Sequence, residues 1–329
     1  MKLIIQPDDG LTPILKALKR ARRSICIVIF RFDRDETEKA LAVAVARGVS
    51  VRALIAHTNS GGAKRLRKLE QRLLEAGVTV TRTADDLPRY HGKMTIIDDA
   101  LYVLGFNYTR QDIEKSRSFG LITRDVRLVR EATSLFEADS LRQPYTPGHD
   151  RLVVSPDTSR DVLSDFLKGA RRELLIYDER LNDKLMLRLL RDRVAAGVVI
   201  RVIGKTGKGL DAVLSRKLPD LRLHARAIIR DGADAFIGSQ SLRKLELDSR
   251  REVGVIIRDS RIARKMRDVF EKDWVEAAPG KKAEKKEIKK AIKAVKAVVR
   301  VAGGRRRAGR AVVARLRQNR QLVPIVRPH

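Results

Sequence analysis

Two short stretches of this chain each place a histidine two residues before a cation. "RYHGKMTIID" contains His91 and Lys93, and "RLHARAIIRD" contains His224 and Arg226. Both stretches read as strands, in which side chains at positions i and i+2 point to the same face. A histidine can act as a nucleophile or a general acid near neutral pH, and a cation beside it can hold phosphate oxygens. The pattern predicts chemistry at a phosphorus atom.

The spacing that follows is the same after both histidines. An aspartate comes seven residues later, at Asp98 and Asp231, and a glycine comes fourteen residues later, at Gly105 and Gly238. One His-x-Lys pair alone is weak evidence, because such pairs occur by chance. The recurrence of the longer pattern makes it specific.

The chain is also a visible duplication. "ARRSICIVIF" begins at Ala21 and "ARRELLIYDE" at Ala170, 149 residues later, and "ARGVSVRALI" and "AAGVVIRVIG" have the same offset. The two histidines are only 133 residues apart, so the second copy has lost about 16 residues. The first copy has an amphipathic helix pattern there, "GGAKRLRKLEQRLLEAG".

The elements that must position the histidines come in the same order in each copy. We expect a helix, a strand, a second helix and a second strand, at 11–21, 24–30, 37–48 and 49–55, and at 160–170, 173–179, 183–197 and 198–204. The histidine element, a strand pair, a closing strand and a basic helix follow. This alternation predicts an α/β fold with parallel pairing and helices on both sheet faces, an α/β/α sandwich made twice. The predicted domains are 1–143, 144–277 and a tail, 278–329, with the linker at 141–150.

The spacing His-x-Lys-x4-Asp-x6-Gly, followed by a small residue and an Asn, resembles the signature of the phospholipase D superfamily. The opening of the second copy, "RLVVSPDTSRDVLSDFLKGARRELLIYDE", is similar to the second half of its bacterial two-repeat members. The resemblance covers roughly residues 10–275. It implies two repeats related by a pseudo-twofold axis, one shared active site at the seam, a covalent phosphohistidine, and neither metal nor cofactor.

The resemblance also assigns roles. It implies His91 as nucleophile and His224 as general acid, although the reverse assignment stays open. Lys93, Arg226 and Asn107 would hold the phosphoryl oxygens. Glu252 lies where the family places a glutamate that orients the opposite histidine. The expected substrate-binding or supporting residues are Asp98, Asp231, Ser239, Ser241 and Ser118.

Four departures from the family pattern bear on activity. Arg226 replaces the second lysine, and it grips phosphate with a different geometry. Asn107 comes sixteen residues after the first histidine instead of seventeen, Ser241 takes the second Asn position, and Ser118 stands where a glutamate is usual. Both an active enzyme and a degenerate polyanion-binding protein remain open.

Charge and composition limit the partners. The 329 residues have a formal net charge of +30, which predicts affinity for polyanions. From Lys281 onward there are 17 Lys or Arg and two Glu, and basic amphipathic helices are expected. The tail has no Phe, Trp or Tyr, so an anionic membrane surface or nucleic acid would attract it by charge alone. The alternative is a helix packed against the body or a disordered solubilising tail. The sequence shows neither a signal peptide nor a transmembrane run, which favours a cytoplasmic protein, peripheral at a membrane or associated with nucleic acid.

These observations give a leading hypothesis and two alternatives. The first is a phosphodiesterase or phosphatidyltransferase that resembles phospholipase D and cardiolipin synthases and acts on a phospholipid. The second is a metal-independent nuclease of the same superfamily, and the third is a non-catalytic polyanion-binding protein. In the first two a monomer would supply both halves of the site.

Overall fold

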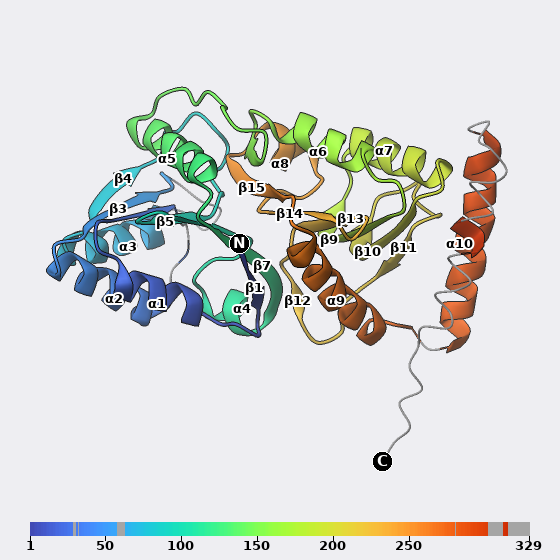
Figure 1. Ribbon diagram of the computed structural model, residues 1–329, viewed down its shortest axis with the longest axis horizontal. Helices are drawn as coiled ribbons and strands as arrows, with labels where there is room; N and C mark the ends of the chain where they lie inside the picture. Colours follow the sequence, from blue (N-terminus) through green and yellow to red (C-terminus); the bar gives the residue numbers. More distant parts are fainter. Residues whose placement is uncertain (29–30, 32, 58–62, 280, 302–311, 315–329) are drawn as a thin grey trace, which may run out of the picture. The chain divides into compact units, whose positions relative to one another are not determined.

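The computed structural model describes residues 1–28, 31, 33–57, 63–279, 281–301 and 312–314 (Figure 1). The chain divides into two compact units. The first comprises residues 1–162, 221–227 and 236–257, and the second comprises the other described residues. The first unit therefore includes three stretches of the predicted second repeat, 144–162, 221–227 and 236–257. The domain boundaries at 143 and 277 remain predictions.

The first unit is built on a mixed sheet. Its strands run in the order β1 (Lys2–Gln6), β7 (Ser116–Thr123), β6 (Ala100–Leu104), β5 (Met94–Ile97), β2 (Ser24–Val28), β3 (Ser50–Ile55) and β4 (Thr79–Arg82). Strands β2, β3 and β4 pair in parallel, whereas β5, β6, β7 and β1 pair antiparallel. The expectation of parallel pairing holds for the strands joined by helices. The hairpin β5–β6, predicted only as a strand pair, is antiparallel, and the edge strand β1, which was not predicted, pairs antiparallel with β7.

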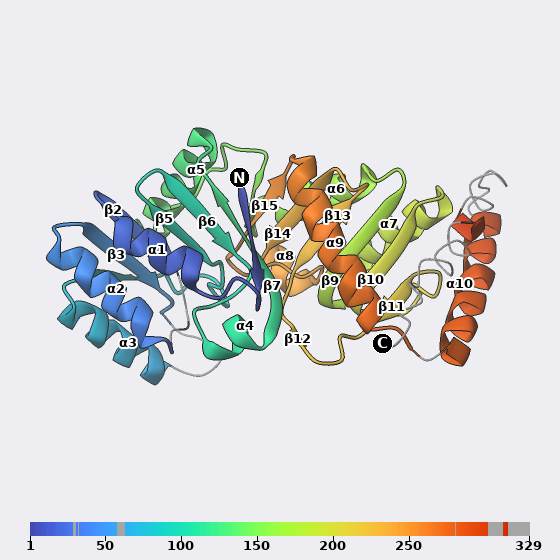
Figure 2. The ribbon, with the colours of Figure 1, turned by 60° about the horizontal axis from the view of Figure 1, so that its bottom comes forward.

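Helices cover both faces of this sheet (Figures 1 and 2). They are α1 (Thr12–Arg20), α2 (Asp35–Ala46), α3 (Ala63–Glu75), α4 (Arg110–Glu114) and α5 (Val126–Leu141). The predicted periodicity explains the packing, since buried Ile14, Leu18 and Leu41 join the strand side chains in one apolar core. Gly48, with φ +81°, follows α2 and ends it as predicted.

The second sheet follows the same scheme. Its strands run in the order β11 (Leu214–Arg216), β10 (Val199–Thr206), β9 (Glu173–Leu181), β13 (Ala227–Arg230), β14 (Asp234–Gly238), β15 (Glu252–Ile257) and β8 (Leu152–Ser155). The predicted α/β class is therefore confirmed in both repeats. After β10 the chain forms the short strand β11 where the first repeat has helix α3. This difference explains why the second repeat is about 16 residues shorter before its histidine.

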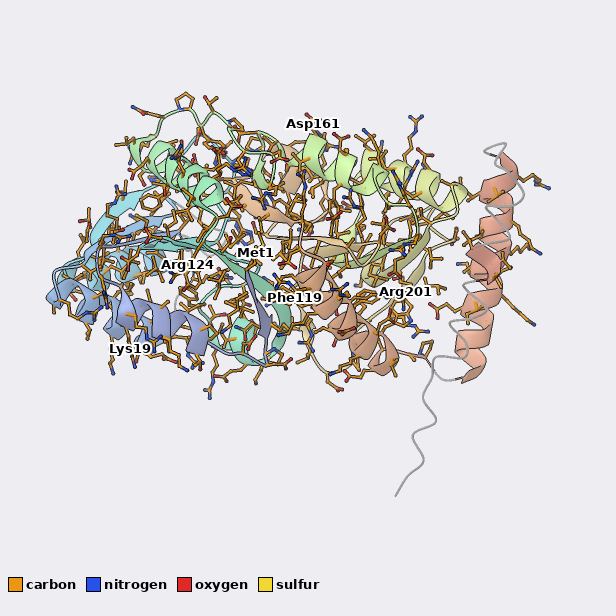
Figure 3. All side chains as sticks on the ribbon, in the orientation of Figure 1. Met1, Lys19, Phe119, Arg124, Asp161 and Arg201 are labelled. Atoms are coloured by element: carbon orange, nitrogen blue, oxygen red, sulfur yellow. The ribbon has the colours of Figure 1, made fainter. Side chains whose placement is uncertain are left out.

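The helices of the second repeat are α6 (Ser159–Lys168), α7 (Lys184–Ala195), α8 (Lys244–Asp248) and α9 (Ser260–Glu276). On α9, Phe270 and Trp274 stack, and the buried guanidinium of Arg201 lies 5.4 Å and 5.5 Å from their ring centroids. Arg201 is labelled in Figure 3. Arg201 also donates to Glu271 at 2.7 Å. Its charge is thereby compensated inside the unit.

The basic tail begins as a packed helix. Helix α10 (Lys281–Val301) contacts α7 and β11, and it buries Ile288, Val295 and Val299. Its lysines from residue 286 onward are exposed. The predicted amphipathic helix is thus present. The second predicted tail helix, at 310–320, lies outside the described residues except for 312–314. Among the helices that the structure describes, none is both long and apolar enough to span a membrane.

Candidate active site

The first histidine lies just before a strand. His91 and Lys93 precede β5, so the prediction that they belong to a regular strand is wrong. The backbone N–H groups of His91 and Gly92 both donate to the carbonyl of Arg251, at 2.7 Å and 2.9 Å, and Arg251 N–H donates to Arg89. This segment of the first repeat is therefore held by the residue that precedes β15 of the second repeat.

The ring of His91 is contacted by a carboxylate of the second repeat, Glu252, and by the amine of Lys93 in the first repeat. Nδ1 of His91 lies 2.9 Å from Oε2 of Glu252, which is fully buried at the start of β15. Nζ of Lys93 lies 3.0 Å from Nε2 of His91 and donates to its carbonyl at 2.8 Å. The expected same-face arrangement is present, and Glu252 meets the histidine of the opposite repeat.

Burial and neighbouring charge set the protonation of this cluster. Burial, and then the charges of Lys93, Arg89 and Arg226, hold the pKa of His91 well below its usual value. Burial lowers the pKa of Lys93 to about 7, although Glu252 opposes that shift. A neutral His91 near pH 7 keeps a lone pair that can attack phosphorus.

The second histidine is positioned in the reciprocal way. Strand β12 (Arg222–Leu223) pairs in parallel with β7 of the first repeat, and His224 N–H donates to the carbonyl of Arg117 at 3.1 Å. Burial, followed by Arg226, Lys93, Arg222 and His91, holds the pKa of His224 well below its usual value. Lys93 and His91 are among the causes, so the charges of the first motif act on the histidine of the second.

Arg226 takes the place of the second lysine and keeps its contact. Nη1 of Arg226 donates to the carbonyl of His224 at 2.9 Å, as Lys93 does to the carbonyl of its own histidine. Nε of Arg226 donates to the hydroxyl of Ser241 at 3.3 Å. The exchange of lysine for arginine is therefore accommodated without loss of the buried cation.

Two acidic residues that the sequence reading missed support this site. Oδ2 of Asp112, on α4, accepts from Asn107 N and Nδ2 at 2.9 Å and 2.7 Å. Oε2 of Glu246, on α8, accepts from Ser241 N at 2.6 Å. Each acid comes five residues after the Asn or Ser of its repeat. This shared spacing was the signal that could have revealed them.

Asp112 also faces the second histidine. Its Oδ2 lies 3.6 Å from Nδ1 of His224, and that buried nitrogen has no hydrogen-bond partner within the described residues. Ser118, at the position equivalent to Glu252, is buried, and the same part of the structure gives its hydroxyl no partner. The carboxylate near His224 thus comes from a different position than the family pattern implies.

The remaining predicted residues lie around this cluster or away from it. Ser239 accepts from Val253 N–H at 3.1 Å, and its hydroxyl opposes the burial that raises the pKa of Glu252. Asp98 accepts from the backbone N–H groups of residues 22–24, and Asp231 from those of residues 171–173. These two aspartates hold the starts of β2 and β9.

Gly92 packs directly against Val253 of the second repeat. A Cβ atom at this position would lie 2.6 Å from Cγ2 of Val253, so only glycine fits. We expect Gly92→Ala to lower the free energy of unfolding by about 1–3 kcal/mol, because the added methyl forces the two backbones apart. Urea unfolding measures this. The matched control is Gly148→Ala, whose nearest neighbour is the flexible end of Glu131, and equal losses in both variants would contradict the prediction.

Comparisons with known proteins are consistent with this arrangement. A family model described as "Cardiolipin synthase, PLD-like domain" matches residues 14–140 and 163–274. The mouse protein "Mitochondrial cardiolipin hydrolase" is 31% identical over 135 residues, which are 40% of this chain and 58% of that protein. The chain therefore matches little more than half of this relative's length.

Solved structures show the same fold. The polyphosphate kinase of Porphyromonas gingivalis superposes with a TM-score of 0.69 at 18% identity, over 82% of this chain and 46% of that one. The phosphatidylserine synthase of Haemophilus influenzae gives 0.64 at 12% identity, over 84% and 85%. At these identities the likeness shows the fold alone.

Proposed function

Since this chain belongs to the phospholipase D superfamily, in the family of cardiolipin synthases with a phospholipase D-like domain, we propose that it is an active enzyme that cleaves or transfers phosphodiester bonds. The observation that carries the proposal is the mutual effect of the two motifs. Lys93 and His91 lower the pKa of His224, and Arg226 lowers that of His91. Groups that shift one another's pKa in this way can act on one bound phosphate.

The first chemical step uses His91 as the nucleophile. The contact of Nδ1 with Glu252 favours the tautomer that carries its proton on Nδ1 and leaves the lone pair on Nε2. Nε2 attacks phosphorus, a P–N bond forms, and the P–O bond to the leaving group breaks. Lys93 and Arg226 stabilise the negative charge on the phosphoryl oxygens.

His224 supplies and recovers the proton. A bound phosphodiester carries a negative charge, which offsets the cations that lower the pKa of His224 and favours its protonated form. Protonated His224 gives its proton to the leaving oxygen. In the second step neutral His224 takes a proton from water or an alcohol, whose oxygen attacks phosphorus and breaks the P–N bond. Water gives hydrolysis, and an alcohol gives transfer.

Asp112 would act through His224. Its carboxylate favours the protonated imidazole 3.6 Å away, so Asp112→Asn should lower the pKa of His224 further. We expect kcat near neutral pH to fall about 10- to 100-fold and the alkaline limb of the kcat profile, which reports the substrate-bound enzyme, to move to lower pH. A pH profile measured on a chromogenic phosphodiester checks this result. Ser118→Ala is the control and should keep the wild-type profile. An unshifted limb in Asp112→Asn would refute the role.

A glycerophospholipid is the proposed substrate. The description of the matching family and the name of the mouse relative, both of which refer to cardiolipin, support this choice. The test incubates the purified protein, with excess chelator, with phosphatidylglycerol or cardiolipin vesicles and, separately, with single- and double-stranded DNA. Turnover of lipid that is lost in His91→Ala supports the proposal. Turnover of DNA alone would replace the lipid by nucleic acid.

A further inference from the structure

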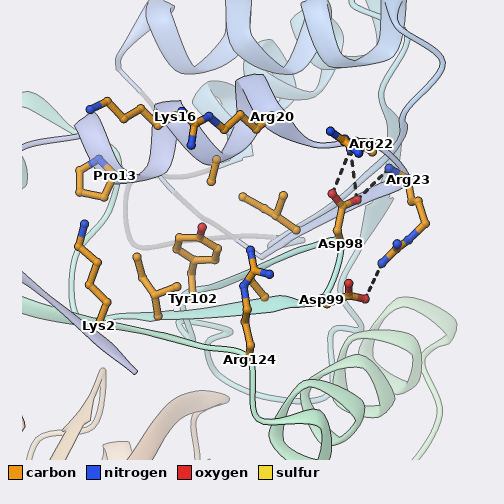
Figure 4. Close-up of a pocket in the computed structure, with 14 residues that line it drawn as sticks. Lys2, Pro13, Lys16, Arg20, Arg22, Arg23, Asp98, Asp99, Tyr102 and Arg124 are labelled. Atoms are coloured by element: carbon orange, nitrogen blue, oxygen red, sulfur yellow. Dashed lines mark hydrogen bonds and ion pairs between the residues drawn. The ribbon is translucent and has the colours of Figure 1, made fainter.

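A second basic hollow lies in the first unit, apart from the histidines. Its volume is about 550 Å³, and α1, the turn between β5 and β6, and the ends of β1 and β7 line it (Figure 4). His91 precedes β5, whereas this turn follows that strand. Seven extended residues separate the two places by on the order of 20 Å. The hollow is therefore distinct from the candidate active site.

Cations dominate the lining of this hollow. Its charged side chains are two acids, Asp98 and Asp99, and six cations, Lys2, Lys16, Arg20, Arg22, Arg23 and Arg124. The backbone N–H groups of residues 22–24 bind Asp98, and Arg23 pairs with Asp99 (Figure 4). The other cations form no ion pair within the described part of the chain. A net positive charge is left facing the hollow.

Helix α1 concentrates two of these charges. Lys16 and Arg20 are four residues apart, so they lie on the same face of α1, and both line the hollow. Like charges at this spacing destabilise an isolated helix. Arg124 lies close enough to Tyr102 to oppose the burial that raises the pKa of that phenol. The cations thus face one another across a confined space.

The second repeat shows that the fold does not require these charges. The positions equivalent to Lys16 and Arg20, 149 residues later, are Asp165 and Gly169. In the second repeat the side chain of Arg230 lies at this place beside Gly169. Its guanidinium lies 4.5 Å from the centroid of the Phe166 ring and pairs with Asp234. A Cβ atom on Gly169 would lie 2.3 Å from Nη1 of Arg230. At the equivalent place in the second repeat, the Arg230 side chain therefore fills the space, and Asp234 compensates its charge.

We propose that the hollow of the first repeat binds a compact anion with two or more phosphate groups, either free or as a phosphorylated lipid head group. Its volume is that of a small-ligand site, and its cations are placed to bind phosphate oxygens. A nucleic-acid strand is less well suited. Tyr102 is the aromatic residue of the lining and is only 6% exposed, so no ring is presented to a base.

Calorimetric titration of the full chain with pyrophosphate tests the proposal. Lys16→Gln/Arg20→Gln should weaken binding by about ten-fold or more, because two charge-assisted contacts are lost. The matched control is Lys19→Gln/Lys39→Gln, which removes two exposed cations outside the lining, one of them from the same helix (Figure 3). The control should change the dissociation constant less than two-fold. Equal weakening in both double variants would mean unspecific attraction and would overturn the proposal.

Lys93→Gln separates this hollow from the candidate active site. The variant should retain the binding event that Lys16→Gln/Arg20→Gln weakens, since Lys93 is not part of the lining. If it loses binding while the α1 variant retains it, the anion binds at the histidines and the proposal is wrong. This binding measurement does not depend on turnover. A result that contradicts the proposed anion site therefore leaves the proposed enzymatic function untested and intact.

Vesicle sedimentation identifies the source of the phosphate groups. Phosphatidylcholine vesicles with phosphatidylinositol 4-phosphate, whose head group carries two phosphates, are compared with phosphatidylserine vesicles of equal surface charge. Preferential sedimentation with phosphatidylinositol 4-phosphate that requires Lys16 and Arg20 identifies a lipid head group. Pyrophosphate binding without that preference identifies a free anion. Binding of oligothymidine that requires the same two cations and that pyrophosphate does not displace would overturn the proposal in favour of a nucleic-acid track.

Discussion

Replacing His91 with alanine is expected to lower kcat for a chromogenic phosphodiester by about 10³-fold or more, because no other group in the site would form the covalent intermediate. His224 is a poor substitute, since its Nδ1 makes no contact comparable to that between His91 and Glu252. Steady-state assays with excess chelator measure the loss. Quenching the wild type in alkaline detergent with a phosphorus-labelled substrate should also trap label on the protein, because a P–N bond to histidine is stable in base and labile in acid.

The control for this variant is His57→Ala, which changes a histidine of the loop after β3. It should retain wild-type kcat, and both variants should unfold at the same urea concentration as the wild type. Label trapped on His91→Ala at the wild-type level would show that another residue is the nucleophile. Unchanged turnover in that variant would rule out catalysis through His91 for the substrate used.

Glu252→Gln is expected to lower kcat/KM by about 100-fold or more, because an amide holds the Nδ1 tautomer of His91 less firmly than a carboxylate does. Its pH profile should change as well. Burial lowers the pKa of Lys93 to about 7, and the charge of Glu252 opposes that shift. Without that charge Lys93 loses its proton at lower pH, so the alkaline fall of kcat/KM should begin at lower pH.

Glu114→Gln provides the comparison for that experiment. Glu114 is a surface carboxylate of α4 that pairs with Arg34 and Arg110, so its amide variant should stay within two-fold of wild type. A loss of activity in Glu252→Gln with an unmoved alkaline limb would indicate that Lys93 does not govern that limb. Wild-type kcat/KM in Glu252→Gln would contradict the orienting role altogether.

The repeated motif and the duplication were accessible to sequence reading because both are local patterns. The helices α2 and α7 and the strands β2 and β9 show their periodicity within a dozen residues. The opposite-repeat contact of Glu252 could be anticipated only through the family resemblance. Nothing in a linear pattern indicates that Arg251 would hold the backbone beside His91.

Asp112 and Glu246 escaped prediction for a physical reason. They lie on α4 and α8, which have five residues each, too few to show helical periodicity. The edge strands β1 and β8 were missed because three apolar residues shortly before a proline do not distinguish a strand from the start of a helix. The basic hollow depends on side chains that come together from α1, β1 and β7, so only the folded chain reveals it.

The reciprocal backbone pairing has a consequence for how activity reports on folding. Arg251 of the second repeat holds the backbone beside His91, and Arg117 of the first repeat holds that of His224. The backbone at each histidine is fixed only when a residue of the other repeat, far away in sequence, has packed against it. Neither repeat can therefore form its half of the site alone. Recovery of turnover after dilution from denaturant would therefore record the closure of two long loops at once. In this molecule the enzymatic assay is also a measure of long-range assembly.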